Sequence, residues 1–113
     1  MDKLMTYGEL LQKLLQDYCC LLNAQPTPGV EAHCVFDTKR NQYLLVEWGW
    51  AGKKRVRRVV LYVCLVEGKF CIEEDWTEEG IATELLQAGV PRSNIVLAFQ
   101  HPSLRDEPEK IAA

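Results

Sequence analysis

Two short glycine-containing segments, Ala51-Gly52 and Glu67-Gly68, constrain the fold of this chain more than any other feature of its sequence. Each separates two runs rich in β-branched and aromatic residues, and a two-residue connection containing glycine is typical of a tight β-hairpin. Consecutive hairpins build an antiparallel meander, because strands that follow one another along the chain then pair in the sheet. We therefore expect four antiparallel strands, over residues 30–37, 42–50, 54–66 and 69–75.

An amphipathic helix is expected before the strands. Apolar residues recur at intervals of three and four between residues 3 and 24, which places them on one stripe of a helix. Asp2 could cap this helix, or it could begin later at the capping box formed by Thr6 and Glu9. The segment "NAQPTPG" at residues 23–29 ends it, because its prolines and glycine favour a loop.

A second helix and a final strand are expected after the meander. Thr77 is a candidate N-cap for the helix, and Gly89 is a candidate residue just beyond its end. The apolar segment 94–100 predicts a short strand, and the polar residues 101–113 predict a C-terminal tail. At 113 residues, the chain has the size of one α+β domain spanning residues 1–113.

The two glycine turns also predict which residues lie opposite one another. The expected pairs are Trp50 with Lys53, Trp48 with Arg55, Val66 with Lys69, Cys64 with Cys71, and Tyr62 with Glu73. Side chains alternate between the two faces of a strand, so this register assigns every residue to a face. The expected core face carries Leu44, Val46, Trp48, Val59, Leu61, Val63, Leu65, Phe70 and Ile72. The expected polar face carries Tyr43, Glu47, Lys54, Arg58, Tyr62, Glu73 and Asp75.

A cluster of positive charge lies in the second hairpin. Its five cations are Lys53, Lys54, Arg55, Arg57 and Arg58. Alternation places Lys54 and Arg58 on the polar face and the other three on the core face, so the cluster is divided. One hypothesis is contact with DNA or with an acidic partner. The other is a solvated strand end whose arginines stack on Trp48 or Trp50 and pair with nearby carboxylates.

Composition limits the classes of function. The net charge is −3 and the pI about 5.4, so any DNA contact has to come from a local patch. The five cysteines include no C-x-x-C, and we expect them to be mostly buried and reduced, with no disulfide framework, zinc site or other cofactor. No apolar run approaches the roughly 20 residues of a membrane span. The N-terminus lacks the features of a signal peptide, so we expect a cytoplasmic protein.

Three groups of residues suggest catalysis, and each has a simpler explanation. The segment "EEDWTEE" at 73–79 holds five carboxylates, but they alternate on a strand and begin a helix rather than converge on a metal. Asp37 with "EGK" at 67–69 imitates a metal-dependent nuclease, but we expect "EGK" to be a hairpin turn. His33 and His101 lack a group to orient them toward a cysteine nucleophile. We therefore expect a protein that is not an enzyme and binds no metal.

Several motifs in order along the chain are more specific. They are "GW-x-G-x-x-R" (Gly49, Trp50, Gly52, Arg55), "GK-x-x-I" (68–72), "D-x-TE-x-GIA-x-EL" (75–85), "GVP" (89–91) and "IVLAF-x-x-P" (95–102). With these motifs, the sequence resembles the XisI-like family, the cyanobacterial excision-controlling factors associated with DNA elements. The resemblance covers nearly the whole chain. It rests mainly on turn glycines, caps and core positions, so it supports the fold more directly than any site.

The resemblance implies a small accessory protein. The family's founding members help to control site-specific excision of a DNA element during heterocyst development, with a nuclease-like partner, XisH, and a separate recombinase. We therefore expect an XisH-like partner or a homodimer, with Trp48, Trp50 and Tyr62 as interface residues, because exposed strand edges and apolar patches need covering. The alternative is a direct DNA-binding module that uses the basic hairpin at 53–58.

Overall fold

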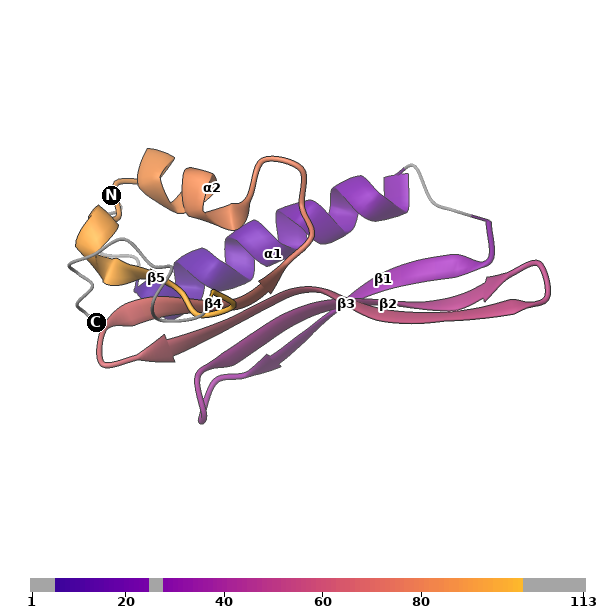
Figure 1. The fold of residues 1–113 in the computed structure, drawn as a ribbon, viewed down its shortest axis with the longest axis horizontal. Helices are drawn as coiled ribbons and strands as arrows, with labels where there is room; N and C mark the ends of the chain where they lie inside the picture. The colour runs from indigo at the N-terminus through magenta and orange to yellow at the C-terminus, as the bar shows by residue number, and fades with distance from the viewer. Residues whose placement is uncertain (1–5, 25–27, 101–113) are drawn as a thin grey trace.

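A computed structural model describes residues 6–24 and 28–100. The elements are α1 (Tyr7–Ala24), β1 (Val30–Asp37), β2 (Gln42–Ala51), β3 (Lys54–Val66), β4 (Lys69–Asp75), α2 (Ile81–Gln87), the short 3-10 helix η2 (Arg92–Asn94) and β5 (Ile95–Leu97). The strands form one sheet in the order β1-β2-β3-β4-β5 (Figure 1). The predicted α+β fold with its four-stranded antiparallel meander is confirmed, and the final strand pairs parallel to β4. The predictions for Asp2, His101 and the tail at 101–113 concern residues outside the described ranges.

The described part of α1 begins at the predicted capping box. The backbone N–H of Glu9 donates to Thr6 Oγ1 at 3.1 Å, and the backbone N–H of Thr6 donates to Glu9 Oε1 at 3.0 Å. These reciprocal bonds satisfy two backbone donors that a helix start otherwise leaves unpaired. The later of the two proposed helix starts is therefore the one found among the described residues.

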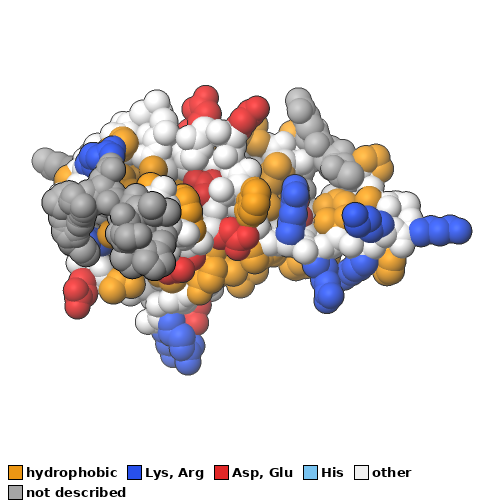
Figure 2. Space-filling view, in the orientation of Figure 1, with side chains coloured by type: hydrophobic (Ala, Val, Ile, Leu, Met, Phe, Trp, Pro, Cys, Tyr) orange, Lys and Arg blue, Asp and Glu red, His pale blue; other side chains and the backbone are white. Residues whose placement is uncertain are grey.

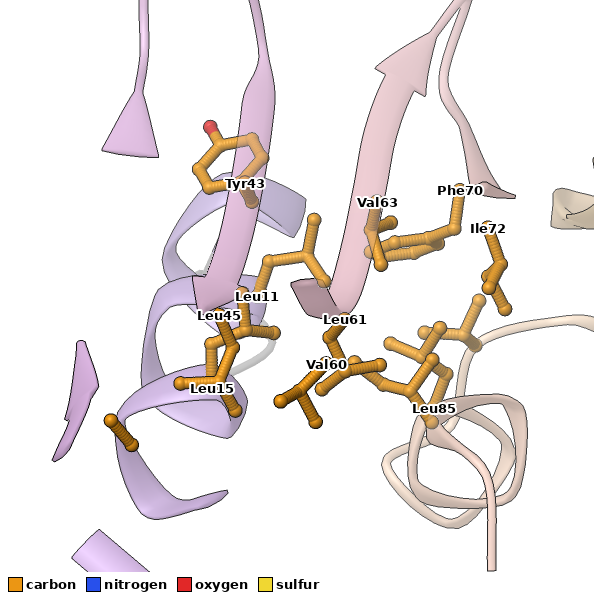
Figure 3. Packing of buried hydrophobic residues seen from close by; sticks show 13 residues of the cluster. Leu11, Leu15, Tyr43, Leu45, Val60, Leu61, Val63, Phe70, Ile72 and Leu85 are labelled. Carbon is orange, nitrogen blue, oxygen red and sulfur yellow. The ribbon is translucent and has the colours of Figure 1, made fainter. Parts of the chain in front are cut away.

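The core lies between the helices and one face of the sheet (Figure 3). Its fully buried side chains include Leu11 and Leu15 from α1, Tyr43 and Leu45 from β2, Leu61 and Val63 from β3, Phe70 and Ile72 from β4, and Ile81 and Leu85 from α2. Burying a side chain of this size contributes about 1.5–3 kcal/mol. Both helices are therefore held on the same side of the sheet by apolar contacts.

The predicted core face of β2 is wrong. Tyr43 and Leu45 are buried, whereas Leu44 and Val46 are only partly buried and Trp48 is 41% exposed. Residues 44–46 are all apolar, so alternation in the sequence does not reveal which face meets the helices. Packing against α1 determines which face of β2 is buried, and it buries the face that carries Tyr43 and Leu45.

The predicted register of the second hairpin is also wrong, by two residues. Its turn contains Gly52 and Lys53, so that Ala51 lies opposite Lys54. The observed pairs are therefore Trp50 with Arg55, Trp48 with Arg57, and Glu47 with Arg58. A bulge follows, because Val46 pairs with Val59 while Leu45 pairs with Leu61, which leaves Val60 as the extra residue on β3.

The next hairpin agrees with its prediction near the turn. Glu67 and Gly68 both have positive φ angles, of 51° and 77°, as the tight primed hairpin turn requires. The predicted pairs Val66–Lys69 and Cys64–Cys71 are confirmed. The predicted pair Tyr62–Glu73 is wrong, because a bulge places Tyr62 opposite Glu74.

The second helix begins at Ile81, later than the predicted start near Thr77. Asp75 supplies the capping oxygen: its Oδ2 accepts from the backbone N–H of Ile81 at 2.7 Å, and its Oδ1 accepts from the backbone N–H of Thr77 at 2.9 Å. The predicted stop at Gly89 is confirmed. The N–H of Val90 donates to the Leu85 carbonyl and that of Gly89 to the Leu86 carbonyl, which are the two bonds of a Schellman motif.

The helices leave one face of the sheet uncovered. In Figure 1, α1 and α2 lie above the sheet, and no described helix or strand lies on its lower face. The β2–β3 hairpin extends to the right of this body, beyond the end of β4. Within the described residues, no helix is long and apolar enough to cross a membrane.

Candidate interaction site

The hairpin arm, defined here as residues 46–59, places the predicted basic cluster at one end of the molecule. Figure 2 shows Lys and Arg side chains gathered at this end. All five predicted cations are exposed. On the side away from β2, β4 pairs with β3 only between Leu61 and Val66, so residues 54–59 form a free strand edge within the described chain. Charged residues on such an edge discourage edge-to-edge pairing with another copy.

Two of the five cations have partners in the arm itself. Arg58 Nε donates to Glu47 Oε1 at 2.8 Å, and the Glu47 side chain is only 13% exposed. The Arg55 guanidinium lies over the Trp50 ring, 5.4 Å from its centroid. This contact is the arginine–tryptophan stacking that one of the two hypotheses predicts. Lys53, Lys54 and Arg57 make no hydrogen bond or ion pair with any described residue, so three positive charges remain available.

The uncovered sheet surface, here called the open face, is largely apolar. Cross-strand partners share a face, so the register defines it in three rows: Glu31–Trp48–Arg57, His33–Val46–Val59 and Val35–Leu44–Tyr62. Three of the large apolar side chains on this face are substantially exposed, with values of 47% for Val35, 41% for Trp48 and 53% for Trp50, which follows Trp48 on β2. The predicted interface residues Trp48, Trp50 and Tyr62 therefore share one surface.

Local contacts hold Trp48 and Trp50 in place. The His33 and Trp48 rings are stacked, with centroids 4.3 Å apart. The backbone N–H of Trp50 donates to the Gly29 carbonyl at 2.8 Å. Between the two tryptophans, Gly49 has a φ angle of 150°, and a Cβ there would collide with the Gly29 carbonyl. The glycine of the "GW" motif is thus required by the close approach of two backbones.

Tyr62 is tied to the sheet by its hydroxyl group. Its Oη donates to Gln42 Oε1 at 2.6 Å, and Cys64 Sγ contacts the same oxygen at 3.2 Å. Burial, followed by the neighbouring Cys64, raises the pKa of the Tyr62 hydroxyl above its usual value. Tyr62 therefore presents a neutral, fixed ring to the open face.

The residues of the predicted nuclease-like arrangement have structural roles. Asp37 caps the β1–β2 turn: its Oδ1 accepts from the backbone N–H groups of Lys39 and Arg40, and its Oδ2 pairs with Arg40 Nη1 at 3.0 Å. The hydrogen bond from the Arg40 side chain lowers the pKa of the Asp37 carboxyl. Glu67 lies in the β3–β4 turn. Among the described residues, no three His, Cys, Asp or Glu side chains are grouped as a metal site requires.

The cysteines are less buried than predicted. Only Cys64 is buried, Cys20 is exposed, and Cys19, Cys34 and Cys71 are intermediate. For Cys20 the difference arises because α1 presents this residue to solvent.

The comparisons with known proteins agree with this architecture. The sequence model of the XisI protein family matches residues 1–109. The chain belongs to the XisI family. A solved XisI-like protein from Anabaena variabilis is 36% identical, with a TM-score of 0.80, and the match covers 88% of this chain and 89% of that one. The fdxN element excision controlling factor XisI from the same organism is 42% identical, with a TM-score of 0.78, and the match covers 93% of this chain and all of that one. No curated protein matched the sequence.

The sequence predicts the basic and aromatic residues of this candidate surface but not its apolar centre. Alternation assigns Leu44, Val46 and Val59 to the core face, and none of the sequence motifs includes Glu31 or Val35. The run of three apolar residues at 44–46 was the available signal, because a strand that is apolar on both faces indicates that both faces are covered.

Proposed function

We propose that this protein is a non-enzymatic accessory factor that controls excision of a DNA element by binding another protein, an XisH-like subunit. The support for the role is membership of the XisI family together with the similarity to a solved excision controlling factor. The observation that carries the binding mode is the hairpin arm, which projects from the body with an exposed Trp50 and three cations free of described partners. Tryptophan and arginine are the side chains that most often dominate protein interfaces.

The test is direct binding of a purified XisH-like protein from the same organism. We expect a stable complex by size-exclusion chromatography with light scattering. Trp50→Ala should weaken it at least about tenfold, because a central aromatic anchor contributes about 2 kcal/mol or more. Lys39→Ala, in the β1–β2 turn, is the control and should leave the affinity unchanged. Absence of a complex at micromolar concentration would rule out the proposed partner.

A second candidate function is direct DNA binding, which the free cations at the arm's tip favour. Binding of a mixed-sequence duplex should be measured by fluorescence anisotropy at several salt concentrations. If phosphates are contacted, the slope of log affinity against log salt should fall by about 2 on removing Lys53 and Lys54, since each phosphate contact contributes about 0.9. The matched control removes Lys39 and Arg40. If the wild type does not bind the duplex at low salt, direct DNA binding is ruled out and protein binding remains as the proposed function.

A further inference from the structure

The open face combines apolar surface with charges of both signs in a definite order. On β2, at the centre, lie Leu44, Val46 and Trp48. Within the row of Trp48, β1 contributes Glu31 and β3 contributes Arg57, one on each side of the tryptophan. The Glu31 side chain is 73% exposed, and Arg57 is exposed with no described ion-pair partner. An antiparallel sheet face exposed to water usually carries polar residues instead of such an apolar centre.

We propose that a second copy of this chain packs on the open face, forming a homodimer whose two-fold axis runs along β2. Such an axis exchanges β1 and β3 between the facing sheets, so that the apolar residues of β2 meet their own copies. Arg57 of each copy then faces Glu31 of the other. The interface is isologous, and one row of the sheet supplies both halves of each ion pair. Two twisted sheets pack in this aligned manner in β-sandwiches.

The order of charges favours a second copy over nucleic acid on this face. A phosphate backbone attracts cations and is repelled by the carboxylate of Glu31, which lies in the same row as Arg57. The tip residues Lys53 and Lys54 lie beyond the rows that the two copies would cover. Edge-to-edge association through residues 54–59 of β3 is opposed by the cations on that segment. This inference does not depend on the excision role or on an XisH-like partner.

The closing experiment uses two charge reversals, Arg57→Glu and Glu31→Arg, with mass measured by light scattering after size exclusion. The wild type is expected at twice the chain mass of 12.9 kDa. Each single variant should be monomeric at the same micromolar concentration, because like charges then face each other across the interface. An equimolar mixture of the two variants should form a heterodimer, because both of its facing pairs are again attractive. Circular dichroism confirms that each variant is folded.

The mixture separates a broken interface from a damaged fold, since misfolded chains do not complement each other. The controls are Lys39→Glu and Glu78→Arg, two exposed charges away from the open face, and both should remain dimeric. A monomeric wild type would overturn the proposal. So would single variants that remain dimeric, or a mixture of monomeric variants that fails to associate.

Discussion

Cys34 lies on β1 against the core, close to Cys19 on α1. Burial raises the pKa of the Cys34 thiol to about 12, and the neighbouring Cys19 contributes to the same shift. Only the thiolate reacts with alkylating reagents, so a raised pKa lowers the reactive fraction. At pH 8 that fraction is about one in 10⁴, against roughly a quarter for an unperturbed thiol.

We therefore predict that iodoacetamide alkylates Cys34 at pH 8 roughly a thousandfold more slowly in the folded protein than in the urea-unfolded chain. The rate should rise with pH over the range below about 12. Peptide mass spectrometry measures the rate at each cysteine in one sample, and the exposed Cys20 serves as the internal control. Equal rates for Cys34 in folded and unfolded protein would contradict a protonated, partly buried thiol.

At the scale of the element, the start of α2 depends on one carboxylate. Asp75 accepts backbone hydrogen bonds from Thr77 and Ile81 and a third bond from the Thr77 hydroxyl. We predict that Asp75→Ala lowers the free energy of unfolding by about 2 kcal/mol, because it leaves partly buried donors without their charged acceptor. Urea unfolding followed by circular dichroism gives the value. Glu78→Ala removes a carboxylate from the same segment without breaking a described hydrogen bond, and it should change stability by less than about 0.5 kcal/mol.

Features of the fold that local contacts determine could be predicted from the sequence. Features that depend on tertiary contacts could not. The capping box at Thr6 and the turn at Glu67–Gly68 could be predicted, because they are set by bonds and backbone angles within a few residues. The start of α2 was placed too early, since Asp75 reaches six residues ahead to cap Ile81. The face of β2 could not be predicted, because it depends on where α1 packs and because a bulge at Val60 shifts the pairing.

The same distinction between local and tertiary contacts applies to the candidate interaction site. The cations and tryptophans of the arm were identifiable from residue type alone, whereas alternation placed Trp48 on the wrong face. Their arrangement was not identifiable, because the two-residue shift of the hairpin places Arg57 beside Trp48 where Arg55 had been expected. The predicted register also did not place Glu31, Trp48 and Arg57 in one row. Only the observed registers of β1, β2 and β3 together show this row.

For the whole molecule, β3 joins a body to an arm. Residues 61–66 pair with β4, and residues 61–64 also pair with β2, whereas residues 54–59 pair only with β2 in the described structure. Resistance to local opening increases with buried contacts and with backbone hydrogen bonds on both sides of a strand. One strand thus contains both a strongly and a weakly supported segment.

We predict that amides of residues 54–59 exchange with deuterium at least about tenfold faster than those of residues 61–66, because opening the arm disrupts fewer contacts. Hydrogen-exchange mass spectrometry with peptides from both halves of β3 measures this within one sample. Face-to-face dimerisation covers side chains and leaves the edge of β3 unpaired, so the contrast should persist in a dimer. Equal protection of the two halves would mean that another strand pairs with this edge in solution, and association would then proceed through the edge despite its cations.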